Sequence, residues 1–215
     1  MTPGSSISQT AQLRIEDVAA REPAETLRAL MRTALFAARR QFFRYAARTI
    51  SRTYEAGGMP AVLAAAPGWR KKAERYGTPS PSAMAHALDG LEPSRADELM
   101  VPALRLECDG FARDAILVCV PSGSFVTARS GYITALMARV AKAARVNACI
   151  VDYRLAPEHP CPAAVDDVES VVRELIARGQ RPERIALVAV SSGAAIALST
   201  AMRLRDVGIG LSSVT

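Results

Sequence analysis

The second half of the chain alternates short apolar runs with longer stretches of helical periodicity. Each run is almost continuously apolar, which is typical of strands that are buried on both faces of a parallel sheet. The four runs are ALRLEC (103–108), AILVCV (115–120), NACIVDY (147–153) and IALVAV (185–190). We therefore expect an α/β fold with a mostly parallel sheet covered by helices.

Two segments between these runs have the spacing of helices that pack on the sheet. Ser130 can cap the first helix, while Asp166 and Asp167 open the second, which Gly179 ends. Both helices would connect parallel strands. The last run, GIGLSSVT, resembles a further strand that begins just before Thr215, so we expect a sheet that is incomplete at its C-terminus. The apolar positions of the two helices are Ile133, Leu136, Met137, Val140 and Ala144, then Val168, Val171, Val172, Leu175 and Ile176.

The first half of the chain has a different pattern. Between Glu25 and Glu55 apolar residues lie on one helical face and arginines on the other. The arginines are Arg28, Arg32, Arg39, Arg40, Arg44, Arg48 and Arg52. The pattern predicts a long amphipathic helix with a solvated basic face; weak contact with a membrane surface and contact with another partner are the alternatives. Residues 57–82 are broken by glycine and proline, which predicts a turn-rich connection.

Composition and charge restrict the class of protein more than its function. Half of the 215 residues are hydrophobic and 22% are charged, which is typical of a soluble globular protein. The net charge of +6 bears mainly on solubility, and we expect no nucleic-acid partner. The sequence has no signal-peptide pattern and no apolar stretch of about 18 residues, so we expect no membrane span. Four cysteines without a C-x-x-C pair favour a cytoplasmic location.

The sequence AVSSGA (189–194) directly follows a predicted buried strand and leads into a helical segment. A serine on such a sharp strand-to-helix turn exposes its oxygen near the positive end of the helix dipole. Ala189 and Gly193 are small, as the close backbones of this turn require. Ser191 is therefore a candidate nucleophile, although a purely structural turn explains the residues equally well.

The sequence PSGSFV (121–126) follows another predicted strand. A loop of small residues at this position can direct backbone N–H groups toward an oxyanion. Gly123 and Ser124 are the candidate donors, together with the N–H of Ser192 after the candidate nucleophile. Taken alone, the sequence would be read as an ordinary turn.

The sequence DYRLAPEHPCPAAVDD (152–167) strongly resembles the hormone-sensitive-lipase group of α/β-hydrolases. In that group the motif Y-R-L-A-P-E-x-x-x-P-A-x-x-D-D stands between the oxyanion loop and the nucleophile elbow, as it does here. We expect a flexible N-terminal tail at 1–22, and the resemblance implies a helical cap-like segment and linker at 23–99 and the first half of an α/β-hydrolase catalytic domain at 100–215.

The resemblance also implies the chemistry. Ser191 would attack the carbonyl of a small acyl ester, the N–H groups of Gly123, Ser124 and Ser192 would hold the oxyanion, and water would release the acyl group. No metal and no organic cofactor are implied. Asp152, Arg154 and Glu158 are expected to fix the loop by hydrogen bonds and ion pairs rather than to act in catalysis.

The chain departs from the pattern of the group at both catalytic loops. Where the group has H-G-G-G-F this chain has PSGSF (121–125), and where the group has G-D-S-A-G-G it has AVSSGA (189–194). The acid and the histidine of the group would follow later strands. The two histidines, His86 and His159, are expected to have structural or solvent roles.

Three interpretations remain open. The first is an esterase-like hydrolase, truncated or degenerate, whose open sheet edge would favour homo-oligomers. The second is a small-molecule-binding protein without turnover, since the plant gibberellin receptor resembles the same group. The third is a basic interaction module that acts through the arginine-rich helix, but it leaves the order of the three loops unexplained.

Overall fold

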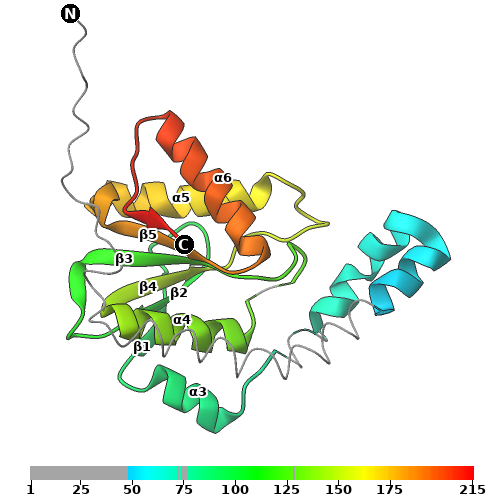
Figure 1. The fold of residues 1–215 in the computed structure, drawn as a ribbon, viewed down its shortest axis with the longest axis horizontal. Helices are drawn as coiled ribbons and strands as arrows, with labels where there is room; N and C mark the ends of the chain where they lie inside the picture. The colour runs from blue at the N-terminus through cyan, green and yellow to red at the C-terminus, as the bar shows by residue number, and fades with distance from the viewer. Residues whose placement is uncertain (1–47, 72, 74–76, 128) are drawn as a thin grey trace, which may run out of the picture.

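The computed structural model describes residues 48–71, 73, 77–127 and 129–215, and its centre is a six-stranded sheet (Figure 1). The strands run in the order β1-β2-β4-β3-β5-β6 across the sheet. Their bounds are Glu92–Arg95 for β1, Ala103–Glu107 for β2, Ala112–Val120 for β3, Val146–Val151 for β4, Ile185–Ala189 for β5 and Ser213–Val214 for β6. The four predicted apolar runs are thus strands β2 to β5, and the last run contains β6.

Strands β3, β4, β5 and β6 are parallel, whereas β1 and β2 are antiparallel to their neighbours. The parallel part agrees with the prediction. The antiparallel direction of β2 and the existence of β1 were not predicted. β1 has the sequence EPSR and is exposed throughout, so it lacks the apolar pattern that indicates a strand. Its short connection to β2 permits only antiparallel pairing.

Helices cover both faces of the sheet (Figure 1). Helix α4 lies on one face, with α3 packed outside it, and helices α5 and α6 lie on the other. The bounds are Pro81–Leu88 for α3, Gly131–Ala144 for α4, Ala163–Ala177 for α5 and Ser192–Asp206 for α6, and a short 3₁₀-helix at Pro182–Arg184 precedes β5. Helices α4 and α5 connect parallel strands, as predicted.

The ends of these helices follow the predicted signals with one difference. The hydroxyl of Ser130 accepts a hydrogen bond from Ile133 N and caps α4. Gly179 takes a φ of 97° just after the end of α5, in the conformation that favours glycine. Helix α5, however, begins at Ala163, before the predicted start, and Asp167 lies inside it as a buried acid. Asp167 is therefore not a capping residue.

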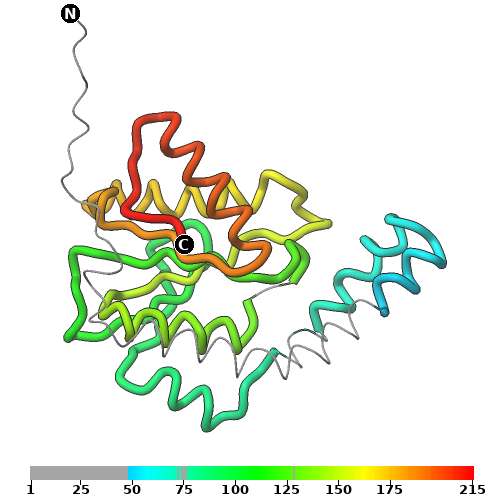
Figure 2. Tube along the Cα trace, in the orientation of Figure 1, coloured from blue at the N-terminus to red at the C-terminus, as the bar shows by residue number. Residues whose placement is uncertain are grey.

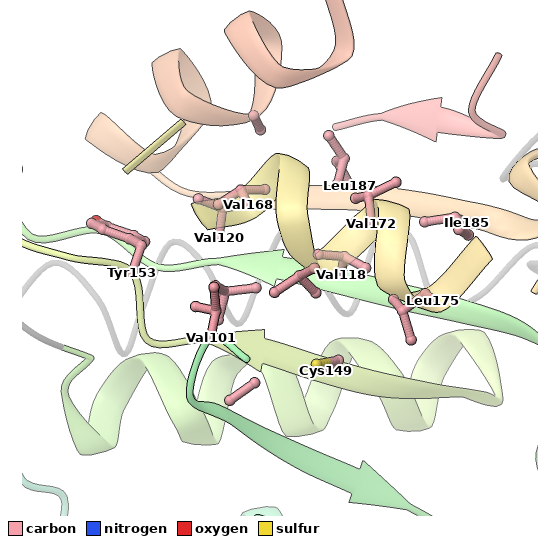
Figure 3. Close-up of a cluster of buried hydrophobic side chains, with 14 of the residues drawn as sticks. Val101, Val118, Val120, Cys149, Tyr153, Val168, Val172, Leu175, Ile185 and Leu187 are labelled. Carbon is pink, nitrogen blue, oxygen red and sulfur yellow. The ribbon is translucent and has the colours of Figure 1, made fainter. Parts of the chain in front are cut away.

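The core consists of two apolar layers separated by the sheet. Side chains alternate along β3, so Val118 and Val120 face α5 and α6 while Cys119 faces α4. Figure 3 shows Val168, Val172 and Leu175 of α5 directed at the strands. Strands β3 and β4 contribute buried residues to both layers. Strand β5 contributes buried residues to the layer under α5 and α6 and partly buried residues to the other layer. This confirms strands buried on both faces.

The described part of the first half is helical from residue 48 to residue 71. The prediction of a turn-rich connection from residue 57 was therefore wrong for its first part. Gly58 takes a φ of 64°, and Pro60 follows at the start of the next helical stretch, where its missing N–H costs no hydrogen bond. The predicted tail at 1–22 and most of the arginine-rich helix lie outside the described residues. Within the described ranges, no helix has the length and hydropathy needed to cross a bilayer.

Candidate active site

Three loops follow the carboxyl ends of β3, β4 and β5. Because these strands are parallel, their carboxyl ends lie at one edge of the sheet. Figure 2 shows the green, yellow-green and orange turns after the three strands at the same end of the molecule. These are the turns that the sequence singles out at 121–126, 152–167 and 189–194. The fold therefore brings the three candidate loops together.

Ser191 lies between β5 and α6 with a backbone conformation that side chains rarely adopt. Its φ is 55° and its ψ is −122°, and the residue is exposed. A strained conformation of this kind costs about 1–3 kcal/mol and persists where the surrounding structure enforces it. Ser191 occupies the N-cap position of α6, yet its side chain makes no capping hydrogen bond. The hydroxyl is therefore left free at the positive end of the helix.

Gly193 explains why the turn can be so sharp. A Cβ atom at this position would lie 2.4 Å from Val120 O and 2.6 Å from Pro121 O. Both contacts are with backbone and cannot be relieved by a side-chain rotation. The first turn of α6 thus touches the backbone at the end of β3, as expected from the small residue at this position.

The loop after β3 is organised around one carbonyl. Gly123 O accepts hydrogen bonds from Val126 N at 3.0 Å, Thr127 N at 2.9 Å and Thr127 Oγ1 at 3.0 Å. Ser124 and Phe125 both have positive φ, of 51° and 64°. The left-handed conformation is strained for residues that carry a Cβ atom, and the H-G-G-G-F pattern of the resembled group would have a glycine in place of Ser124. Among the described residues, no acceptor pairs with the N–H of Ser124 or with that of Ser192.

The third candidate donor, the N–H of Gly123, is already engaged. It donates to Ser192 Oγ at 3.2 Å. This hydrogen bond joins the loop after β3 to the residue that follows Ser191. The structure therefore brings the sequence-predicted residues together, with two backbone N–H groups that have no acceptor among the described residues and one that the Ser192 hydroxyl occupies.

Tyr153 was not predicted as a site residue. Its hydroxyl donates to Pro121 O at 2.9 Å and so holds the start of the same loop. Burial raises the pKa of Tyr153 to about 12, against a smaller opposing contribution from the Ser192 hydroxyl. The phenol is thus a neutral donor throughout the physiological range. Tyr153 is the first residue of the Y-R-L-A-P-E motif, but the motif alone does not indicate that its hydroxyl contacts the loop after β3.

The acidic and basic residues of the loop after β4 hold the loop in place. Asp152 forms two hydrogen bonds with Arg129, at 2.8 and 3.0 Å. The buried carboxylate of Asp167 accepts from the backbone N of Arg154 at 2.7 Å and from its guanidinium. Glu158 pairs with Arg70 at 2.5 Å. The predicted structural role of Asp152, Arg154 and Glu158 is confirmed.

The two histidines do not reach the candidate nucleophile. His86 lies on α3, and His159 is exposed in the loop after β4. Within the described ranges, neither imidazole forms a hydrogen bond with Ser191, and no group of three His, Cys, Asp or Glu residues could hold a metal ion. The described part of the chain thus carries a candidate nucleophile and candidate oxyanion donors but no histidine hydrogen-bonded to Ser191.

A depression of about 680 Å³ lies at the opposite end of the sheet, at the amino ends of β3 and β4. Its walls carry Arg105, Arg113 and Arg181, each of which forms an ion pair with a neighbouring carboxylate. Parallel sheets bind their ligands at the carboxyl ends of the strands. We therefore assign the candidate site to the three loops and not to this depression.

Comparisons with known proteins agree on the α/β-hydrolase fold. A family model described as alpha/beta hydrolase fold matches residues 117–214. Esterase LipU of Mycobacterium tuberculosis is 34% identical over 116 residues, which are 54% of this chain and 38% of that protein. An esterase of Acinetobacter venetianus is 35% identical over 87 residues, which are 40% of this chain and 29% of that protein.

Solved structures agree with the sequence relatives. The crystal structure of an esterase from the bacterial hormone-sensitive lipase family superimposes with a TM-score of 0.58 and 29% identity, over 66% of this chain and 46% of that one. The chain thus spans less than half the length of the curated relatives and of the solved esterase to which it is similar. The family model, the relatives and the solved structure therefore agree that this chain has an α/β-hydrolase fold and is similar to esterases of the hormone-sensitive lipase family.

Proposed function

We propose that this chain supplies the nucleophile and the oxyanion donors of a carboxylic-ester hydrolase that acts on small acyl esters. One observation carries the proposal: Ser191 is held at φ 55° before α6, exposed and without a capping hydrogen bond. An N-cap serine that does not cap its helix has a hydroxyl available for chemistry. The similarity to proteins named esterases supports the same reaction class.

In the proposed reaction Ser191 Oγ attacks the ester carbonyl and its proton passes to a base. The carbonyl oxygen becomes an oxyanion near the N–H groups of Ser124 and Ser192, which are the unpaired donors of the site. The C–O bond to the alcohol then breaks, the alcohol leaves with a proton, and water hydrolyses the acyl-serine. Among the described residues no base forms a hydrogen bond with Ser191, so turnover requires a base that comes into contact with the serine hydroxyl.

Labelling with a fluorophosphonate probe tests the nucleophile. Because no base among the residues that the structure describes forms a hydrogen bond with Ser191, we expect slow labelling of the chain, which added imidazole accelerates by taking the serine proton. Mass spectrometry of the digested protein locates the label. The Ser191→Ala variant should lose it, whereas Ser199→Ala, at an exposed serine on the same helix, should retain it. A label that persists in Ser191→Ala would exclude Ser191 as the nucleophile.

A second candidate function is a small-molecule-binding protein without turnover. The absence of a described base at Ser191 and the engagement of the Gly123 N–H by Ser192 favour it. A small acyl ester should then raise the thermal midpoint of the chain and be recovered intact. Hydrolysis that Ser191→Ala abolishes would reject this alternative.

A further inference from the structure

Arg70 joins the helical segment at 48–71 to two of the three loops of the candidate site, those after β3 and β4. Its guanidinium donates to Val126 O at 2.6 Å and to Ala156 O at 2.5 Å, and it forms a two-pronged ion pair with Glu158. The Arg70 side chain is only 20% exposed. A planar guanidinium with donors on several sides can bridge two carbonyls and a carboxylate at once, which a lysine cannot do.

The hydrogen bonds of the loop after β3 extend this contact to the oxyanion donor. Val126 O and the N–H of Thr127 belong to one peptide group, and that N–H donates to Gly123 O at 2.9 Å. The acceptor, Gly123 O, shares its peptide group with the N–H of Ser124. The hydrogen bond from Thr127 therefore connects the peptide group held by Arg70 to the one that carries the Ser124 N–H. Because a peptide group is planar and trans, fixing its oxygen directs its N–H to the opposite side.

A second, parallel set of bonds ends at the same carbonyl. Arg70 holds Ala156 O, and the N–H of Ala156 donates to Phe125 O at 2.9 Å. The peptide group between Phe125 and Val126 then donates through its N–H to Gly123 O at 3.0 Å. Ala156 O and the N–H of Ala156 belong to adjacent peptide groups, so this second route passes through the backbone of Ala156, whereas the first route runs from one hydrogen-bonded peptide group directly to the next.

We propose that Arg70 is a positioning residue that orients the Ser124 N–H toward the oxyanion through the peptide groups of residues 123–127. The positive charge at Val126 O also polarises the hydrogen-bonded peptides in series, which strengthens each N–H as a donor. In this way the helical segment before the sheet controls the geometry of the oxyanion site. The catalytic part of the inference rests on the proposed esterase function.

Hydrogen exchange of the loop amides in Arg70→Gln tests the inference without any need for catalysis. Loss of the guanidinium should release the Thr127 and Val126 amides, whose exchange we expect to rise about tenfold, as for loss of one supported hydrogen bond.

In the same variant, the rate of Ser191 labelling at saturating fluorophosphonate should fall about tenfold, since an oxyanion donor is misaligned. The half-saturating probe concentration should stay within about twofold, because ground-state binding does not use the oxyanion donor.

Two further variants separate the carbonyl contacts of Arg70 from its ion pair, and a third is a surface control. Glu158→Gln weakens the ion pair but leaves the bonds to Val126 O and Ala156 O, so we expect it to preserve both loop exchange and labelling rate. Arg70→Lys should restore part of the labelling rate through a single carbonyl contact. Arg113→Gln, at an exposed ion pair far from the loops, is the control for loss of one surface arginine.

The two proposals fail in different ways. Unchanged Val126 and Thr127 exchange in Arg70→Gln would overturn the role of Arg70, as would a Glu158→Gln variant as impaired as Arg70→Gln. If Arg70→Gln does not fold, Arg70→Lys decides by the same exchange measurement. Labelling that never depends on Ser191 would reject the esterase function, while faster loop exchange in Arg70→Gln would still support the structural link.

Discussion

At the scale of single residues, the hydroxyl of Ser192 occupies one of the three proposed oxyanion donors, the N–H of Gly123. It accepts the Gly123 N–H at 3.2 Å, so this N–H becomes available to a substrate only when the hydroxyl rotates away. Ser192→Ala removes the acceptor. We expect Gly123 amide exchange and Ser191 labelling both to rise about fivefold, since one neutral hydrogen bond is worth about 1 kcal/mol.

The matched control for this prediction is Ser199→Ala, which removes a hydroxyl from the exposed side of the same helix. It should change neither rate. Labelling that slows in Ser192→Ala would show instead that the hydroxyl assists the reaction. Amide hydrogen exchange and probe kinetics on the same samples distinguish the two.

Residues with a local signal were predictable, and residues that act through long-range contacts were not. Ser191 and Gly193 follow a buried strand at a characteristic spacing, so the sequence indicates both. Arg70 contacts Ala156 and Glu158 across 86 and 88 positions of the chain. Nothing in the neighbourhood of Arg70 in the sequence indicates such a contact, because only the folded chain creates it.

At the scale of elements, strands β3 and β4 bury their thiols completely. Cys119 and Cys149 are inaccessible, whereas Cys161 is exposed on the loop before α5. Burial raises the pKa of both buried thiols, that of Cys149 to about 12. Because the thiolate is the reactive form, we expect Ellman's reagent at pH 8 to modify Cys161 rapidly and the two buried cysteines only after unfolding.

The same raised pKa values predict the direction of the response to alkali. A folded-state pKa above the unfolded value of about 8.5 means that the stabilising contribution is complete below pH 8.5 and is lost as the pH rises toward 12. The free energy of unfolding from urea titrations should therefore fall across this range, and less steeply in Cys149→Ala. Fast modification of Cys119 or Cys149 in the folded protein would contradict the buried placement.

The elements themselves differed in how far sequence could predict them. Strands β2 to β5 carry continuous apolar runs, and helix α4 carries a periodic apolar pattern and a capping serine. The positions of these elements were therefore predicted closely. Strand β1 has no apolar residue that is buried, so pairing with β2 alone makes it a strand. The helical stretch after Gly58 was missed because glycine and proline usually indicate turns, whereas here they mark the junction of two helical runs.

At the scale of the whole molecule, helix α6 and the neighbouring edge strand β6 expose apolar side chains, which together we call the α6–β6 surface. Leu198 is 56% exposed, Met202 47% and Val214, on edge strand β6, 41%. An exposed edge strand beside apolar side chains favours association between copies. We expect the isolated chain to bind the dye ANS and to sediment as concentration-dependent oligomers.

Replacing both Leu198 and Met202 by Gln should shift the sedimentation profile toward the monomer. Met100 is the control, because it is 88% exposed but lies outside this surface, in the connection between β1 and β2. Met100→Gln should leave the profile unchanged. A wild-type chain that remains monomeric at every concentration measured would exclude this surface as the cause of association.

The sequence by itself determined the fold class, the order of the three loops and the identity of Ser191 as the residue to test. These features depend on local periodicity, capping residues and short motifs, which are properties of neighbouring positions. Only the tertiary structure decided that Ser192 engages the Gly123 N–H, that Tyr153 and Arg70 hold the loop after β3, and that neither histidine reaches Ser191. Those contacts join residues far apart in the chain, and their geometry exists only when the strands are paired and the loops meet at one edge of the sheet.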